Sequence, residues 1–270
     1  MKYNNILVTA TNSAYFNALL TQINSFHKYN FDLIDQLIVY DIGLTQEDKD
    51  LLNTMAKVTI KDFSGFKLPY PDYLLPKGYA YKCYCPYNER DNAKRILWLD
   101  SGAAFLRNAQ EIFDIIENEN ILLVEDTNHL NKDFTKKKTI QIMNATDKEL
   151  NAHQLWAGIL GYKPYGKYHK LFEDCYNYSL IDGCIVGNEE NSRHDQSVYS
   201  ILASRYNCPK QDINIFGYWT NNRERNYQAA KKMNAIIYVH RRGFHNANKI
   251  IHIKPPTSNY EKTTYEIVLS

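Results

Sequence analysis

Short apolar runs alternate with amphipathic stretches in the first part of the chain. Three short runs rich in apolar and β-branched residues predict strands: 6–11, 36–41 and 57–60. Apolar residues recur at helical spacing over 16–26, and a second, shorter helix is expected through Leu51 and Leu52. This β-α-β-α-β order predicts an α/β fold with a mixed, mainly parallel central sheet flanked by helices.

Polar residues stand where these two helices are expected to begin. Asn12 or Ser13 can cap the first helix, because a short side chain can accept a hydrogen bond from the free N–H groups of the first turn. Thr45, with Asp48 three residues later, has the pattern of a capping box. Each cap predicts a helix start.

The pattern is less regular after residue 64. Residues 64–80 are rich in Pro, Tyr and Gly, which predicts irregular backbone. Further strands are expected over 95–100, 121–124, 156–162 and 236–240. Further helices are expected over 81–93, 106–117, 167–178 and 195–202.

Ligands of parallel α/β sheets bind beyond the carboxyl ends of the strands. Thr9, Thr11 and Asp41 stand at two of these ends, where hydroxyls can meet phosphate or base edges and an acid can accept from a ribose. The alternative for Asp41 is a turn-forming role before Gly43. Residues 1–105 are therefore predicted to form a nucleotide-binding half.

No internal repeat, low-complexity linker or composition break divides the 270 residues. The sequence therefore predicts one domain over 1–270. Within it, about 106–255 is expected to form the half that binds the donor sugar and the acceptor, and 256–270 a loose tail.

Composition excludes several classes of protein. Hydrophobic residues make up 44% and charged residues 23%, which is typical of a globular protein. The net charge of +2 is too small for a protein that binds nucleic acid through a concentrated basic surface. The basic run 136–138 is diluted by nearby acids and is expected to be a solvated loop. No apolar run approaches the ~20 residues that span a bilayer, and the first residues have no signal-peptide pattern.

The numbers of tyrosine and cysteine residues give weaker indications of ligand and location. Twenty-two tyrosines suit stacking on sugars and bases, although a bias toward Asn, Ile and Lys from an AT-rich genome explains them as well. Five cysteines without a regular framework favour a reducing compartment, which predicts a cytoplasmic location, with peripheral membrane contact as the alternative.

The sharpest local feature is an apolar strand that ends in Asp100 and continues as Ser101-Gly102. Small residues after a strand allow a ligand to approach the backbone closely. A carboxylate at this position can bind a divalent metal that neutralises a diphosphate leaving group. The alternative is an Asp that caps the following segment.

The stretch 96–102 resembles the strand and Asp-x-Asp motif of GT-A glycosyltransferases, and Phe105-Leu106-Arg107 fits the continuation of that motif. Residues 156–160 look like the strand that follows the donor site, where Gly158 would approach the donor. Asp195-Gln196 is similar to the Asp-Gln start of a helix that many members of the family have. In those members the Asp faces the sugar or the acceptor. The resemblance covers about residues 5–205.

The second acid of the Asp-x-Asp motif is Gly102 in this chain, which leaves Asp100 alone. One carboxylate is a poor chelator of Mn²⁺ or Mg²⁺. The resemblance implies that a late histidine can supply another ligand, and His240 is the first candidate, before His245 and His252. An enzyme without metal is the alternative.

Without metal, cations of the protein would neutralise the diphosphate. The candidates are Lys82, Arg95, Arg241 and Arg242. Asp195 can act as the general base of an inverting transfer or bind sugar hydroxyls in a retaining one, whereas its structural alternative is a first-turn Asp on the helix dipole. Glu125 and Asp126 form a further acidic pair after a strand.

The predicted activity is transfer of a hexosyl or pentosyl group from a UDP- or GDP-type nucleotide sugar to a glycan, lipid-linked or surface-polysaccharide acceptor. A sugar nucleotidyltransferase is one alternative, although 10–14 lack the Gly-rich basic loop that such enzymes need. A non-catalytic carbohydrate-binding protein is the other, because of Gly102.

Overall fold

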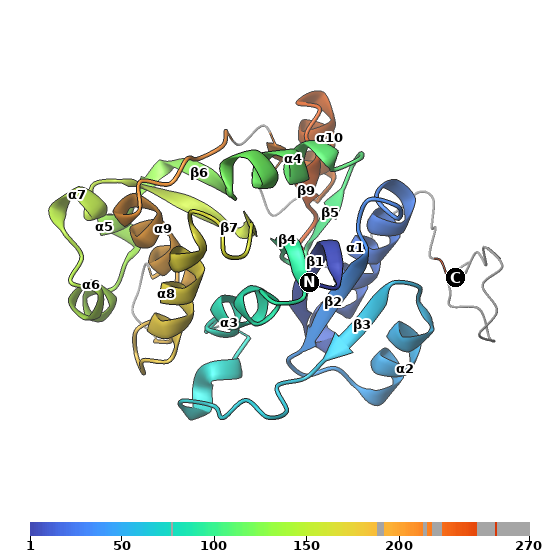
Figure 1. Cartoon of the computed structure of the whole chain (residues 1–270), viewed down its shortest axis with the longest axis horizontal. Coiled ribbons are helices and arrows are strands. Elements are labelled where there is room, and N and C mark those ends of the chain that lie inside the picture. Colours follow the sequence, from blue (N-terminus) through green and yellow to red (C-terminus); the bar gives the residue numbers. More distant parts are fainter. Residues whose placement is uncertain (77, 188–191, 213–214, 218–222, 242–251, 253–270) are drawn as a thin grey trace. The chain divides into compact units, whose positions relative to one another are not determined.

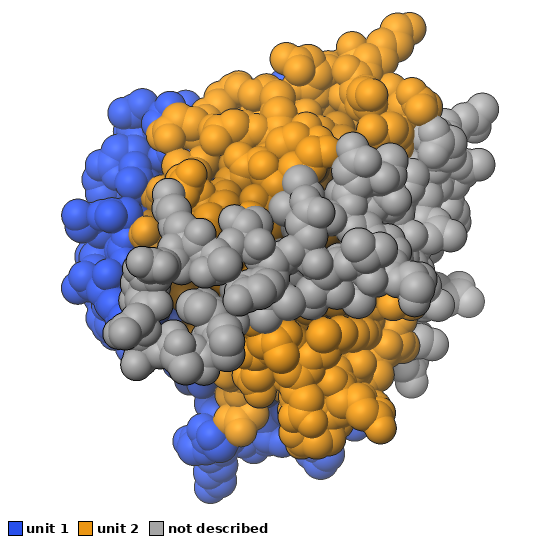
Figure 2. Space-filling model, turned by 90° about the vertical axis from the view of Figure 1, so that its right-hand side faces the viewer, with its two compact units in different colours: residues 1–4, 63–98, 112–213 blue, residues 5–62, 99–111, 214–270 orange. Residues whose placement is uncertain are grey.

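The computed structural model of the chain describes residues 1–76, 78–187, 192–212, 215–217, 223–241 and 252. The chain divides into two compact units, each assembled from separate segments (Figure 2). Unit 1 holds residues 1–4, 63–98 and 112–213, and unit 2 holds residues 5–62, 99–111 and 214–270. The single domain and its two functional halves stay a prediction.

Unit 2 is built on three parallel strands: β1 (Tyr3–Thr11), β2 (Gln36–Asp41) and β3 (Val58–Lys61) (Figure 1). Thr11 of β1 lies opposite Asp41 of β2, so their carboxyl ends are level. Ile6, Leu7 and Val8 are fully buried, because both faces of a central parallel strand are covered. Two helices connect the strands, α1 (Phe16–Tyr29) and α2 (Gln46–Thr54).

The two predicted caps have different outcomes. Thr45 and Asp48 form the capping box at the start of α2, as expected. The cap predicted for α1 was wrong, because a short 3-10 turn, η1 (Ser13–Tyr15), precedes the helix and neither Asn12 nor Ser13 caps it. The Ser13 hydroxyl instead donates to the Asp48 carboxylate and accepts from the N–H of Thr45.

A second, smaller sheet belongs to unit 2. In it β5 (Ala103–Phe105) pairs antiparallel with β9 (Ile237–Val239), and β8 (Phe216–Gly217) pairs parallel with β9. The helix α10 (Arg223–Lys232) packs on this sheet. Its apolar contacts centre on buried residues of β5, the helix, β9 and the connection between the last two: Ala104, Ala230, Ala235 and Tyr238.

Unit 1 contains the remaining strands, β4 (Ala93–Leu99), β6 (Ile121–Leu130) and β7 (His153–Tyr162), of which β6 and β7 are antiparallel. The longer helices of this unit are α3 (Tyr81–Asn88), α4 (Gln110–Glu119), α8 (His169–Ser179) and α9 (Asp195–Arg205). Four short elements complete it: η2 (Pro71–Leu74), α5 (Asn131–Phe134), α6 (Lys137–Met143) and α7 (Asp147–Leu150). The strand order of the large sheet is β3-β2-β1-β4-β7-β6, which confirms the mixed, mainly parallel α/β architecture.

Three predicted boundaries differ from those of the structure. The helix expected over 81–93 ends at Asn88, and the backbone turns before β4. The strand expected to stop at Val124 runs on to Leu130, which places Glu125 and Asp126 inside it. The helix expected from residue 106 begins at Gln110.

The basic run 136–138 is not a wholly solvated loop. Lys137 and Lys138 begin α6 and are exposed, but Lys136 is buried and donates from Nζ to the carbonyl of Val186 at 2.5 Å. None of the helices in the described part of the chain is long and apolar enough to cross a membrane.

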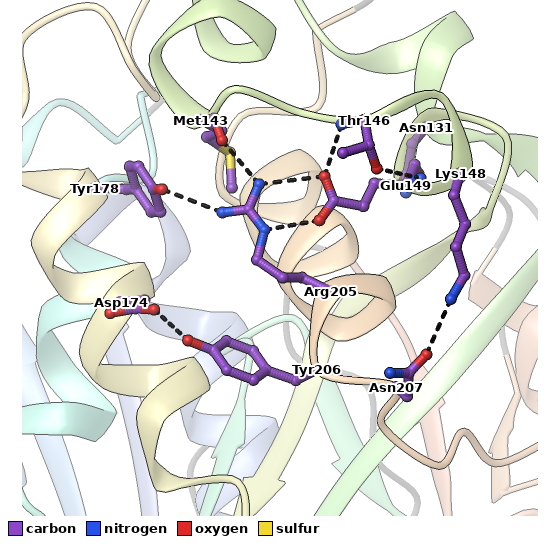
Figure 3. A network of polar contacts seen from close by, with 10 residues as sticks. All are labelled: Asn131, Met143, Thr146, Lys148, Glu149, Asp174, Tyr178, Arg205, Tyr206 and Asn207. Carbon is purple, nitrogen blue, oxygen red and sulfur yellow. Dashed lines mark hydrogen bonds and ion pairs between the residues drawn. The ribbon is translucent and has the colours of Figure 1, made fainter.

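A polar network joins three segments of unit 1 (Figure 3). The guanidinium of Arg205 binds both carboxylate oxygens of Glu149, at 2.7 and 3.2 Å, and also donates to Tyr178 and to the carbonyl of Met143. Burial alone would raise the pKa of Glu149, but the bonds from Arg205 and Thr146 outweigh it and hold the pKa below its ordinary value. The network therefore ties the end of α9 to α7 and α8.

We expect Arg205→Met to lower the free energy of unfolding by roughly 2–3 kcal/mol, because it leaves the Glu149 carboxylate, 8% exposed, without its guanidinium partner. Urea unfolding followed by circular dichroism measures the loss. Lys170→Met is the control, because the ammonium of Lys170 pairs with Glu173 and Asp174 on the surface, where such pairs contribute less than about 1 kcal/mol. Equal losses in the two variants would contradict the assigned role of the network.

Candidate active site

The turn that carries Asp100 is held by one buried amide. Gln22 of α1 is fully buried, and its Nε2 lies 2.9 Å from the carbonyl oxygen of Asp100, 3.2 Å from that of Ala103 and 3.4 Å from that of Leu99. The N–H of Ala103 closes the turn on the Asp100 carbonyl at 2.9 Å. The backbone at Asp100 is therefore fixed by a side chain about eighty residues away in the sequence.

Gly102 meets the backbone that follows β9. The N–H groups of His240 and Arg241 both donate to the Gly102 carbonyl at 2.9 Å. A Cβ at position 102 would lie 2.6 Å from the carbonyl oxygen of Arg241, closer than real Cβ contacts come. A side chain at position 102 is thus incompatible with this backbone packing.

The same contact places His240 beside the motif. His240 is fully buried, and Arg241 adopts φ 69°, a left-handed conformation that costs a residue with a side chain on the order of 1 kcal/mol. Strained backbone of this kind is frequent at functional sites. Arg242 and His245 lie outside the described residues.

The three residues predicted to bind the nucleotide lie at the carboxyl ends of β1 and β2. Thr9 is fully buried, and its hydroxyl has no hydrogen-bond partner within the described residues. The Thr11 hydroxyl donates to the carbonyl of Asn12 at 3.2 Å. Nucleotide binding by Thr9 and Thr11 stays a prediction.

Asp41 already has a structural role. One carboxylate oxygen accepts from the N–H groups of Gly43 and Leu44, at 2.8 and 2.7 Å, and the other lies 2.6 Å from the ammonium of Lys49. Burial would raise the pKa of Asp41, but these bonds outweigh it and lower the pKa. The carboxylate therefore forms the turn, which was the alternative interpretation, and nucleotide binding by Asp41 stays a prediction.

Unit 1 contains a second cluster of residues that the sequence predicts to bind the donor or to act in catalysis. Lys82 of α3 and Asp195 of α9 are both buried, and Nζ lies 3.5 Å from the carboxylate. The ammonium also lies 5.1 Å from the ring centre of Tyr79 and 5.9 Å from that of Trp98. A buried ion pair between aromatic rings is costly to desolvate, and such groups are typical of functional sites.

The start of α9, which carries Asp195 and Gln196, is fixed by its neighbours. Arg193 donates to the Asp126 carboxylate at 2.8 Å, and its N–H donates to the carbonyl of Phe134 at 3.1 Å. The next residue, His194, has φ 53° and ψ −121°, a conformation that glycine adopts far more readily. Tertiary contacts therefore impose the orientation of Asp195 against a local backbone preference.

The other predicted positions lie elsewhere in the fold. Arg95, early in β4, pairs with Glu117 at 3.7 Å, so its charge already has a partner away from the carboxyl end of the strand. Gly158 lies in an irregular part of the β6–β7 ladder. Between the paired positions of this part, β7 has four residues, 156–159, and β6 has only Val124. Glu125 pairs with Lys210 at 2.8 Å.

A metal site is not complete in the described part of the chain. Asp100 and His240 are the predicted ligands, but no group of three His, Cys, Asp or Glu side chains gathers there in a metal-binding arrangement. His252, another of the candidate histidines, contacts His27 instead. Its N–H donates to the His27 ring, and the two rings lie against each other. Burial lowers the pKa of His27 to about 3. Dependence on Mn²⁺ or Mg²⁺ therefore stays a prediction.

Three residues of these clusters were missed by the sequence analysis. Gln22 fixes the Asp100 turn. Gln154 fixes Gln196, and Arg193 fixes the start of α9. Gln22 had a signal, because it interrupts the apolar face of an otherwise regular amphipathic helix. The other two had none, since nothing in their local sequence distinguishes them from surface residues.

No protein-family model and no curated protein matches the sequence. The structure is nevertheless similar to solved glycosyltransferases. The galactosyltransferase LgtC, solved with donor and acceptor sugar analogs, has a TM-score of 0.52 and 13% identity over 90% of this chain and 88% of its own. Mouse xyloside xylosyltransferase 1 has a TM-score of 0.50 and 12% identity over 88% of this chain and 97% of its own.

The bifunctional glycosyltransferase WbbM is similar over 92% of this chain, with a TM-score of 0.54 and 11% identity. The chain spans 47% of WbbM. These similarities show the fold: the chain has the GT-A fold of glycosyltransferases, as the resemblance of residues 96–102 implied.

We expect Gly102→Ala to lower the free energy of unfolding by roughly 1–3 kcal/mol, because the added methyl group must displace the Arg241 backbone. Thermal unfolding measures the change. Ser101→Ala, which removes an atom at the neighbouring position instead of adding one, should have a smaller effect. A Gly102→Ala variant as stable as the wild type would show that the backbone of 240–241 does not pack here.

Gln22→Met should cost roughly 1–3 kcal/mol of stability, because a thioether of similar size cannot donate to the buried carbonyls of Asp100 and Ala103. Gln36→Met is the matched control, since its amide bonds Thr59 in an exposed position. Denaturant midpoints that fall equally in both variants would contradict the anchoring of the turn by Gln22.

Proposed function

We propose that the chain is a glycosyltransferase that moves a sugar from a nucleotide-sugar donor to a glycan, lipid-linked or surface-polysaccharide acceptor. The observation that carries this proposal is the Asp100 turn, anchored by Gln22 at the carboxyl end of β4 in a GT-A fold. Ligands of open α/β sheets bind at this edge, and function depends on the residues present there.

The residues of each unit have separate roles in the proposal. In unit 2, Thr9 and Thr11 bind the nucleotide, and Asp100 with Ser101 and Gly102 contacts the sugar diphosphate. The small 101–102 segment and the buried Thr9 hydroxyl support these roles.

In unit 1, Lys82 supplies a buried positive charge and Asp195 a buried carboxylate. A desolvated ammonium of this kind suits an anionic group of a substrate. Asp195 either accepts the proton of the acceptor hydroxyl, in an inverting transfer, or binds sugar hydroxyls, in a retaining transfer. Gln196 adds a neutral hydrogen-bonding group next to it.

The test is binding and turnover with a panel of UDP-galactose, UDP-glucose, UDP-xylose and GDP-mannose, which separates hexosyl from pentosyl and UDP- from GDP-type donors. Calorimetry measures binding, and nucleotide release measures donor hydrolysis, each with Mn²⁺, with Mg²⁺ and with a chelator. We expect Asp100→Asn and Asp195→Asn to lower turnover by roughly 100-fold or more. Asp50→Asn, at an exposed position of α2, should leave turnover unchanged.

Absence of binding to every donor by the wild type would refute the proposal. Binding without hydrolysis or transfer would favour the non-catalytic carbohydrate-binding alternative, which the loss of the second acid at Gly102 motivates. Pyrophosphate release from a nucleoside triphosphate and a sugar phosphate would indicate a nucleotidyltransferase instead.

A further inference from the structure

Gln154 is a buried amide beside the start of α9. It lies on β7 opposite Asp126 of β6, and it is fully buried. Its Oε1 accepts a hydrogen bond of 2.8 Å from Nε2 of Gln196, the residue that follows Asp195. Gln154 is therefore in direct contact with a residue predicted to bind sugar.

The other half of this amide is not used. Nε2 of Gln154 carries two N–H donors, and neither has a hydrogen-bond partner within the described residues. Buried donors without a partner are rare, because each loses its bonds to water without compensation. Such a group points to an acceptor that binds there in the working protein.

The neighbouring polar groups do not provide that acceptor. The Asp126 carboxylate accepts from Arg193, His129 and the N–H of Asn128. The Ser200 hydroxyl donates to the carbonyl of Gln196 and accepts from the N–H of Leu155. These groups thus bond other protein groups, and the two N–H donors of Gln154 have no partner within the described residues.

The chemistry of the surroundings limits the ligand. The amide is neutral. Asp126, which lies opposite Gln154 on β6, is paired with Arg193, and Asp195, which precedes Gln196, is paired with Lys82. A further anion would have to be desolvated beside two carboxylates, which is unfavourable. A neutral hydroxyl oxygen accepts a hydrogen bond without that cost, and sugars offer several.

We propose that Gln154 is a sugar-binding residue whose Nε2 donates to a saccharide hydroxyl next to Gln196. The inference rests on the proposed function and names a substrate contact of the same reaction. The hydroxyl belongs either to the sugar of the donor or to the acceptor, and the experiment separates these two sources.

The first measurement is stability, because a ligand-binding amide and a structural amide respond differently. Gln154→Met keeps the volume and removes the unpaired donors. It also removes the acceptor of the Gln196 amide, but Gln196 is only partly buried and can bond water instead, so the melting temperature should stay within about 2 °C of the wild type or rise. Asn30→Leu is the control, because both ends of this buried amide bond the backbone, at Ala109 and Arg107, and its melting temperature should fall by more than about 4 °C.

The second measurement is affinity. Gln154→Met should raise the KM of the sugar substrate by roughly 5- to 10-fold, the factor that one lost neutral hydrogen bond produces. A change in KM for donor hydrolysis without acceptor assigns the hydroxyl to the donor sugar, and a change only in the acceptor KM assigns it to the acceptor.

Saturation-transfer NMR with free galactose, glucose and xylose tests the residue independently of catalysis. Loss of the wild-type saccharide signal in Gln154→Met supports the inference even if no nucleotide sugar binds, in which case the proposed function alone fails. Unchanged KM values and unchanged saccharide signals in Gln154→Met overturn the inference while the proposed function stands. A melting temperature that falls as in Asn30→Leu, or an absence of saccharide signal and of donor binding in the wild type, also overturns it.

Discussion

The packing of backbone against backbone at Gly102 is the constraint on which the proposed donor site of unit 2 depends. Its carbonyl accepts from His240 and Arg241, and the ladder between β5 and β9 continues from that point, with Ala103 opposite Val239. A side chain at 102 would separate these segments. The glycine that appears in the sequence as the loss of an acidic ligand is therefore the residue that brings His240 to the Asp100 turn.

Buried amides perform a related task in both units. Gln22 satisfies the carbonyls of a turn that regular secondary structure leaves unpaired, and Gln154 fixes Gln196 at the first turn of α9. Amides suit this role because they donate and accept without introducing charge into a buried region. The strained backbone at His194 and at Tyr79, with φ 53° and 58°, shows that tertiary contacts impose the geometry around the Lys82–Asp195 pair.

The elements that periodicity predicted were those with strong and uniform patterns. The strand before Asp100, the early β-α-β-α-β order and the capping box at Thr45 are present as expected. The errors arose where a tertiary contact overrode the local signal. Ser13 bonds Asp48 instead of capping α1, and Lys136 is buried although it belongs to a basic run.

The sequence by itself determined the α/β class, the buried strands and the identity of the strand-end groups, because burial on both faces requires consecutive apolar residues and a polar residue must follow where the strand leaves the core. Only the tertiary structure decided the state of those groups. It showed that Asp41 is occupied by its own turn and Lys49, that Thr9 has no partner among the described residues, and that Gly102 excludes a second acid. The reason is physical: hydrogen bonds and close contacts between residues far apart in the sequence depend on distances that no local pattern encodes.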